Sequence, residues 1–449
     1  MRKSLFVLAV VALLAMSFVV SAQEDLSSVD PTGQTITYWH EWDGAQQEAL
    51  DEIIDRFNSD NEWGITVEQV ALGSTSSVRD QISAGITTGE LPNLAGATFV
   101  NDAMGYFLDG VLVPLDPYYN DPTWGFSEEQ VADLDQSLLD GNRPVFGPFN
   151  GELLAWPTGL SFNVMSVNMD MLNSLGFDAP PATLEEFAAV SCAAAELEGP
   201  NGEDVQGFPI RTSGTDLYSF IISNGGQIFD AEADAYDFTN DAFIEVGQFF
   251  QDLYNNGCAY VPDGSFVNTA DFAFGLNPMA VGSTAGVPFI NGDIESSGSG
   301  IENWVNTTVP WTEGNRTLQT SMRSLGVFVS TPAEQLATWL FIKHLASTES
   351  QVTWTELTQY QPYTQSGLEG LSEEFLAGAP QFNSIYEARI SGEINLWNLP
   401  IHQRNFPASQ TLDTFIANIT VGEMDVMEAA QTAQDEANEI YQEDLESLE

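Results

Sequence analysis

Apolar and polar residues follow two different spacings along the first hundred residues. Ile36 and Tyr38 stand at alternate positions, which predicts a strand. The apolar residues between Ala49 and Phe57 recur at the spacing of a helix. A second strand pattern, a helix that ends at Gly89 and a third strand pattern follow before residue 100. This order predicts an open α/β sheet, whose ligands bind at the carboxyl ends of the strands.

Two later segments have the pattern of amphipathic helices. Residues 180–197 contain a capping box, with Thr183 as the N-cap and Glu186 three residues later. Residues 240–258 contain a predicted stop at Gly257. The apolar face of this second helix consists of Phe243, Val246, Phe250 and Leu253. Together with the strand patterns before them, these helices predict a second α/β unit.

The chain is too long for one hydrophobic core, because cores stop growing at about 250 to 300 residues. Its 449 residues therefore predict two domains. The segment around Pro157 and Gly159 leaves the first α/β unit and begins another, so it is a candidate crossing between domains. Between Ser283 and Asn315 the chain is rich in Gly, Ser and Asn, which predicts irregular surface structure.

The amino-terminal segment, residues 1–22, has the layout of a secretory signal peptide. Arg2 and Lys3 precede an apolar run that ends at the small residues Ser21 and Ala22. The run is shorter than the roughly 20 residues of a membrane-spanning helix. We therefore expect cleavage after Ala22 and export to a periplasmic or extracellular location at the cell surface. An uncleaved anchor is the alternative.

The composition is strongly acidic, with 65 Asp and Glu against 11 Lys and Arg and a net charge of -54. Such a surface disfavours nucleic acid and anionic lipid as partners. It is typical of a hydrated coat suited to high salt, where screening shortens the range of self-repulsion. Binding of many cations is the alternative, but the sequence has no D-x-D-x-D-G loop that would support a calcium site.

The chain has two cysteines, Cys192 and Cys258. In an exported protein such a pair predicts a disulfide, and the two predicted helices place the cysteines where a bridge is sterically plausible. The three histidines, His40, His344 and His402, are not spaced with a cysteine as a zinc motif requires. We expect no metal site and no cofactor.

Seven segments in a shared order resemble the extracellular solute-binding proteins of ABC importers, the family that includes maltose-binding and glycerol-3-phosphate-binding proteins. The segments are ITYWHEWDGAQQEALDEIIDRFN, SAGITTGELPNL, DGVLVPLDPY, NGELLAWPTGLSFNVMSVNMDMLNSLGFDAPPATLEEF, NGGQIFD, FGLNPMAVGST and QLATWLFIKHLASTES. The resemblance runs over almost all of the chain after residue 22. One departure is Ser-Val-Asn-Met at residues 166–169, where the family often has Tyr-Asn-Lys.

The resemblance implies a two-lobed periplasmic-binding-protein fold of type II, in which hinge closure clamps the ligand between lobes joined by three crossings. The crossings map near Thr158, Gly282 and Leu325. The implied lobes are residues 23–158 plus 283–325 and residues 159–282 plus 326–449. The implied partners are a small polar ligand and a membrane permease, and the implied state is a monomer.

The candidate ligand residues lie at strand ends and crossings of this fold, where aromatic faces and planar hydrogen-bonding groups could hold a sugar. They are Trp39, His40, Ser76, Ser77, Thr98, Asn101, Thr158, Gly159, Asn224, Gly226, Ser283, Thr284, Arg323, Trp397 and Arg404. Structural alternatives remain open, among them core packing for Trp39 and a salt bridge for Arg323.

The function implied is capture of a mono- or oligosaccharide or related polyol for an importer. Arg323 keeps open glycerol-3-phosphate or another anion as the ligand, because a guanidinium can bind phosphate. The alternative of another class is a secreted carbohydrate-active enzyme. No G-x-S-x-G, H-E-x-x-H or P-loop motif supports that alternative, so we expect a protein that is not an enzyme.

Overall fold

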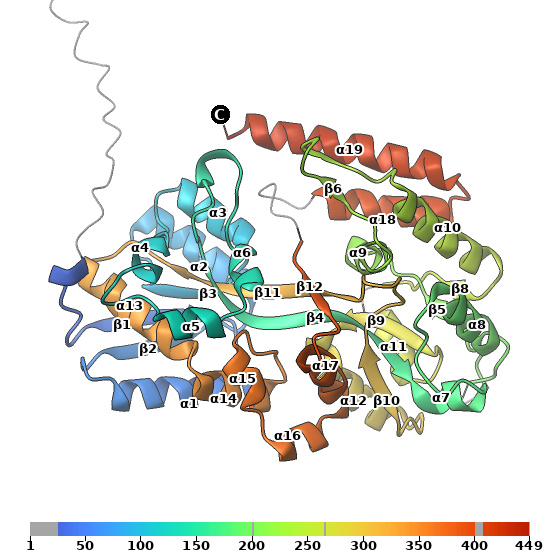
Figure 1. Cartoon of the computed structure of the whole chain (residues 1–449), viewed down its shortest axis with the longest axis horizontal. Coiled ribbons are helices and arrows are strands. Elements are labelled where there is room, and N and C mark those ends of the chain that lie inside the picture. Colours follow the sequence, from blue (N-terminus) through green and yellow to red (C-terminus); the bar gives the residue numbers. More distant parts are fainter. Residues whose placement is uncertain (1–25, 200–201, 265, 400–406, 449) are drawn as a thin grey trace, which may run out of the picture.

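The computed structural model describes residues 26–199, 202–264, 266–399 and 407–448, so the predicted signal peptide lies outside the described residues. Two lobes lie side by side (Figure 1). Two long strands, β4 (Trp156–Asn168) and β11 (Thr317–Val327), run from one lobe to the other. The predicted two-lobed α/β architecture is therefore confirmed.

The first lobe is built on three parallel strands, which alternate with helices along the chain as predicted. β1 (Thr35–His40) pairs with β2 (Thr66–Ala71) on one side and with β3 (Leu94–Thr98) on the other. The buried residues of β1 share a core with the apolar face of α1 (Gly44–Asp60), which explains the helical spacing seen in the sequence. α2 (Thr75–Thr88) ends as predicted at a left-handed glycine. The lobe continues with α3 (Val100–Leu108), α4 (Asp116–Tyr119), α5 (Glu128–Asp133) and α6 (Gln136–Asp140).

One sheet extends through both lobes, with the strand order β10-β4-β11-β3-β1-β2. β4 and β11 are antiparallel neighbours at its centre. In the second lobe, β4 also pairs with β9 (Met279–Ser283) and β10 (Trp304–Thr307), and β11 pairs with β12 (Asn395–Trp397). The lobes are therefore joined by hydrogen-bonded strands, so their relative motion has to bend or twist these two strands.

The second lobe packs helices around a separate apolar core. Its elements are α7 (Met169–Ser174), α8 (Leu184–Ala194), β5 (Phe208–Pro209), α9 (Gly214–Ser223), β6 (Phe229–Asp230), β7 (Ala235–Tyr236), α10 (Asp241–Asn255), β8 (Ala259–Tyr260), α11 (Val267–Ala273), α12 (Val287–Ser297), α18 (Pro407–Ile419) and α19 (Val426–Glu446). The predicted capping box of Thr183 and Glu186 is confirmed. The predicted Cys192–Cys258 disulfide, from the end of α8 to the loop after α10, is present.

The predicted division of the chain between the lobes needs correction in two segments. Residues 325–354, with α13 (Pro332–Leu345) and α14 (Thr348–Thr358), share the first core with β1 and α1. Residues 287–304 share a core with Phe272 of α11 and Ala280 of β9. Residues 283–325 therefore belong mainly with the second lobe, and they form α12 and β10 where irregular structure was expected.

The crossings differ accordingly. Gly282 pairs with Val164 of β4 inside the second lobe, so it is not a crossing. The chain crosses in β4, returns in β11 and crosses again between α15 (Gln365–Glu369), which packs on α14, and α17 (Pro380–Ile390), which packs on β10. The short α16 (Glu373–Gly378) lies between these two helices.

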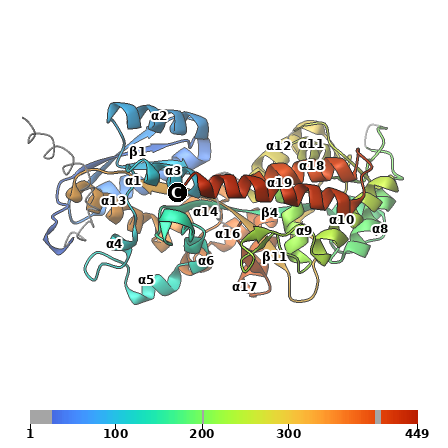
Figure 2. The same ribbon diagram turned by 90° about the horizontal axis from the view of Figure 1, so that it is seen from above.

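The carboxyl-terminal helix links the lobes a further time. α19 packs in the core of the second lobe and extends toward the first lobe (Figures 1 and 2). Leu448, just after this helix, packs in the first lobe beside Phe146 and Phe149. Within the ranges that the structure describes, no helix is long and apolar enough to cross a membrane.

Candidate ligand-binding site

A cavity of about 290 Å³ lies where β11 passes between the lobes. The first lobe contributes the start of α3 and the loop after α6, and the second lobe contributes α9. The lining residues are Phe99, Val100, Asn101, Gly141, Asn142, Thr215, Tyr218, Gln319, Thr320, Ser321, Met322, Ser324, Asn398 and Leu399. None of these described lining residues carries a charge, and they combine amide and hydroxyl groups with two aromatic rings.

Two polar atoms of this lining are buried without a partner. The Tyr218 hydroxyl has no hydrogen-bond partner among the described residues, and neither has Oδ1 of Asn101. Burial raises the pKa of Tyr218 well above its ordinary value, so the hydroxyl stays protonated and can donate as well as accept. A buried polar group without a partner costs free energy. Both groups are therefore available to a polar ligand.

Other polar lining residues are already fixed by hydrogen bonds within the protein. Ser219 Oγ donates to Oε1 of Gln319 at 3.0 Å, and Ser324 Oγ donates to Oδ1 of Asn142 at 2.7 Å. Thr320 donates to Asn398. These bonds hold the amide planes in place, so a ligand would meet a pre-oriented surface.

Aromatic rings border the cavity from both lobes. Tyr218 packs against Trp397, with 6.1 Å between ring centroids, and Phe99 stands at the start of α3. Trp397 was a predicted ligand residue. In the structure it packs behind Tyr218 and is not itself among the described lining residues. Flat apolar faces beside hydroxyl and amide groups match the two kinds of surface that a sugar ring presents.

Arg323 forms a compact network at the first-lobe side of the cavity. Its Nη1 donates to Oε1 of Glu41 at 2.8 Å and to Oγ1 of Thr75 at 2.7 Å. Its guanidinium also lies over the rings of Trp42 and Phe99, at 5.4 and 5.7 Å from the ring centroids. Glu41 is 8% exposed, and burial raises the pKa of its carboxyl while Arg323 opposes that rise. The predicted salt-bridge alternative for Arg323 is therefore present in the structure.

The predicted residues at the end of β1 and after β2 are not in the described lining of the cavity. Trp39 is half-buried and packs against a core of the first lobe. His40 is fully buried, and its Nε2 lies 3.0 Å from Oε1 of Gln69. Ser76 and Ser77 stand in the first turn of α2, where Ser74 is the N-cap and accepts from the Ser77 backbone N–H.

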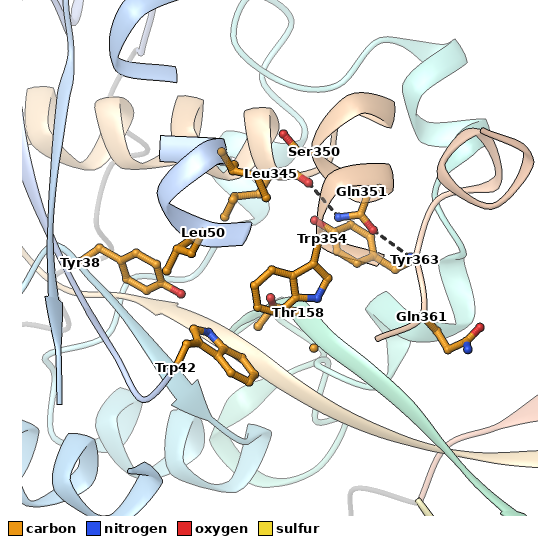
Figure 3. A pocket seen from close by; sticks show the side chains of 12 residues that line it. Tyr38, Trp42, Leu50, Thr158, Leu345, Ser350, Gln351, Trp354, Gln361 and Tyr363 are labelled. Atoms are coloured by element: carbon orange, nitrogen blue, oxygen red, sulfur yellow. Dashed lines mark hydrogen bonds between the residues drawn. The ribbon is translucent and has the colours of Figure 1, made fainter. Parts of the chain in front are cut away.

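Thr158 and Gly159 line a second, much smaller cavity of about 20 Å³, which has room for about one water molecule. Figure 3 shows Tyr38, Trp42 and Trp354 around this space. It lies beside the first crossing, inside the first lobe, and it is too small for a sugar.

The other predicted residues are mostly held by local hydrogen bonds. Asn224 donates to Phe220 O and Pro310 O, and a Cβ at Gly226 would lie 2.6 Å from Ile221. Ser283 caps a 3-10 turn, and Thr284 Oγ1 accepts from the Phe162 backbone N–H. Thr98 pairs along the sheet with Ser324, but its side chain and Arg404 lie outside what the structure describes. Asn101 is the one predicted residue in the described lining of the larger cavity.

Sequence reasoning missed Tyr218, Phe99, Asn142 and Gln319. Tyr218 stands in the run DLYSFII, where its ring contributes to an ordinary apolar helix pattern. Glu41 and Thr75 each lie one residue from a predicted candidate, but no charge pattern connected them to Arg323. In the described part of the chain, no group of three or more His, Cys, Asp or Glu could hold a metal ion.

The two lobes, the crossing strands and the cavity between them define the class of two-lobed solute-binding proteins. Residues 52–379 match the bacterial extracellular solute-binding protein family, and the chain belongs to this family. No curated protein matches it at the sequence level.

Solved structures of this class are similar over nearly the whole chain. The cyclic α-maltosyl-1,6-maltose binding protein of Arthrobacter globiformis matches with a TM-score of 0.71 and 18% identity, covering 91% of this chain and 99% of that chain. The sugar-binding protein MalE of Xanthomonas citri matches with a TM-score of 0.70 and 17% identity, covering 91% and 98%. UgpB of Mycobacterium tuberculosis matches with a TM-score of 0.68 and 18% identity, covering 91% and 98%. At these identities the similarity establishes the fold.

Proposed function

We propose that this protein is the substrate-binding component of an ABC importer and that its inter-lobe cavity binds a neutral sugar or polyol. The observation that carries the proposal is the pair of buried, unpartnered groups, the Tyr218 hydroxyl and Asn101 Oδ1, in a described lining without charge. A ligand hydroxyl satisfies such groups, whereas an apolar ligand would leave them unpaired.

The size of the cavity supports a small ligand. Its volume of about 290 Å³ is near the lower end of the roughly 300 to 1,000 Å³ that small-molecule pockets occupy. One of the similar structures is named for a maltose-type sugar and another is named as a sugar-binding protein, which agrees with this chemistry. The UgpB structure contains glycerophosphocholine, which carries a phosphodiester, so a polyol that bears a phosphate group is the alternative to test.

The engagement of Arg323 favours the neutral ligand. Its guanidinium already pairs with Glu41 and stacks on two rings, so phosphate binding there would have to break a partly buried ion pair. The described lining itself offers no cation. Arg323 is thus better explained as a support behind the cavity wall than as an anion receptor.

In this proposal the chain is exported through its signal peptide, closes its lobes on the sugar and delivers it to a membrane permease, without catalysis. Ligand contacts from both lobes would favour the closed form, because a ligand shifts a conformational equilibrium by its differential affinity for the two states. The permease would recognise the closed form.

The test is isothermal titration calorimetry on residues 23–449 in about 1 M NaCl, which screens the negative surface. The panel contains maltose-type oligosaccharides, monosaccharides, polyols, glycerol-3-phosphate and glycerophosphocholine. We expect saturable binding of a neutral sugar, with the sugar recovered unchanged after long incubation. Binding of a phosphorylated polyol alone would support the anionic alternative, and loss of the bound sugar to a new product would indicate an enzyme.

A further inference from the structure

The Arg323 side chain contacts residues that follow the carboxyl ends of all three parallel strands of the first lobe. Its guanidinium contacts Glu41, just after β1, and Thr75, the first residue of α2 after β2. It also lies over the ring of Phe99, just after β3. In an open α/β sheet these strand ends are where a ligand is expected. Here one half-buried side chain occupies their meeting point.

Arg323 itself is absent from the described cavity lining, although its neighbours Met322 and Ser324 are part of it. A β-strand directs successive side chains to opposite faces. The pairing of β11 with β4 shifts register between Ser321 and Arg323, which locally changes this alternation. The guanidinium therefore lies beside the loops of the first lobe. Its contact with the cavity lining is the one with the Phe99 ring.

Phe99 is held by charged groups at both its ring and its backbone. A second guanidinium, that of Arg79, lies 5.5 Å from the centroid of the same ring. Arg79 donates to Oδ2 of Asp102 at 2.8 Å, and this same oxygen accepts from the Phe99 backbone N–H at 3.1 Å. Two arginine–carboxylate pairs thus fix one aromatic residue of the cavity wall.

We infer that Arg323 is a positioning residue: by stacking on Phe99 and pairing with Glu41, it sets the place of the Phe99 ring at the cavity wall and thereby the selectivity for the ring faces of a sugar. The inference rests on the proposed function of the cavity. It differs from direct binding because Arg323 is not among the described residues that line the cavity. A flat ring fixed at one angle accepts a sugar whose C–H groups face it and disfavours an epimer with a hydroxyl there.

A double-mutant cycle separates positioning from direct contact. Phe99→Ala and Arg323→Gln should each weaken binding of the best neutral sugar by about tenfold. Arg323→Gln added to Phe99→Ala should cause little further loss, because its effect passes through the missing ring. Additive losses in the double variant would show that Arg323 binds the ligand itself, and would overturn the inference.

The ratio of affinities for different sugars is a second readout, and a purely structural role of Arg323 would not change it. Arg323→Gln should reduce the affinity ratio between the best sugar and its epimers, and Arg323→Lys should restore this ratio only in part, since ammonium lacks the planar stacking surface. Arg316→Gln is the matched control, because Arg316 also stacks on a ring, Trp311, and pairs with a carboxylate, Glu393, away from the cavity. The control should leave affinity and selectivity unchanged.

A ligand-free arm keeps the two proposals distinguishable. With 4-fluorophenylalanine introduced at position 99 alone, the otherwise native protein should give one narrow fluorine NMR resonance, and Arg323→Gln should broaden or split it. If the protein binds no sugar but the resonance responds, the proposed function fails while the positioning role stands. An unchanged resonance in Arg323→Gln would overturn the positioning role whatever the ligand.

Discussion

Gly159 lies against the indole of Trp42, so that a Cβ atom on this glycine would come within 3.1 Å of Cη2 of the ring. The glycine has a left-handed φ of 52° and lies near the start of β4, where the strand still packs in the core of the first lobe. The first crossing is thus packed tightly against the same tryptophan on which Arg323 stacks.

Gly159→Ala should lower the free energy of unfolding by about 1 to 3 kcal/mol, because it combines backbone strain with a contact that Trp42 cannot easily avoid. Chemical denaturation measures the change. Gly176→Ala is the control for strain alone, since Gly176 also has a left-handed φ, 87°, but no atom within 4 Å of its added Cβ. Equal losses in both variants would show that contact with Trp42 contributes nothing.

Tyr218→Phe should weaken sugar binding by about tenfold while leaving the unliganded protein as stable as before or slightly more stable. The hydroxyl has no partner to lose among the described residues, and its removal ends a desolvation cost. Calorimetry with the best sugar and thermal unfolding without it measure the two effects.

Tyr441→Phe provides the opposite control, because the Tyr441 hydroxyl donates to Oδ1 of Asp234 at 2.7 Å, away from the cavity lining. This variant should lose stability and keep its affinity. If Tyr218→Phe binds the sugar as tightly as the wild type, the Tyr218 hydroxyl is not a ligand contact.

Replacing both Cys192 and Cys258 by serine should lower the free energy of unfolding by about 4 kcal/mol. The bridge closes a loop with a sequence separation of 66 residues, and the chain-entropy model assigns a stabilisation of this size to such a loop. Denaturation of the variant against the oxidised wild type measures the loss. A wild type that responds to reductant no differently from the variant would show that the bridge is not formed.

Stability should fall as the pH drops from about 7 through the region below 6.5. Burial lowers the pKa of His40 and of His344 from the ordinary value of 6.5. The unfolded chain then takes up protons that the folded chain resists, so acid favours unfolding by up to about 1.4 kcal/mol per pH unit for each proton. The contribution of the neutral, buried histidines to stability is fully present above pH 6.5. It is lost as the pH falls from 6.5 toward the lowered pKa of each histidine in the folded protein.

His40→Gln should reduce this pH dependence, and the further change His344→Gln should remove most of the remainder. Denaturant titrations between pH 7.5 and 5.5 in 1 M NaCl measure the slope with surface carboxylates screened. A slope that is identical in His40→Gln and wild type would exclude His40 as a contributor.

The local elements of this protein could be predicted because their signals lie within a few residues of one another. The capping box of Thr183 and Glu186 and the glycine stop after α2 each depend on one turn of helix. The succession of strands and helices in the first lobe followed from the change between alternating and helical spacing. The order of the strands in the sheet did not follow, because β3 pairs with β1 and not with β2, the strand before it in the chain. The Cys192–Cys258 bridge could be predicted for another reason, because an exported chain with two cysteines has one possible intramolecular pairing.

The lobe assignment of residues 283–325 and of α13 and α14 could not be predicted in this way. The apolar face of a helix predicts that the helix packs on a core, but it does not indicate which of two cores. The crossing strands are buried in both lobes, so their apolar residues do not mark where one lobe ends. Only the packing of α12 against α11, and of α13 beside β1, decides where the chain turns back.

The sequence by itself determined the alternation of strands and helices, the acidic composition, the paired cysteines and the resemblance to solute-binding proteins, because these depend on residue type and spacing. The tertiary structure alone decided which side chains meet. It paired Arg323 with Glu41, buried His40 and left the Tyr218 hydroxyl at the cavity without a partner among the described residues. Whether a polar group is available to a ligand depends on what surrounds it in space, and residues far apart in the chain supply those surroundings.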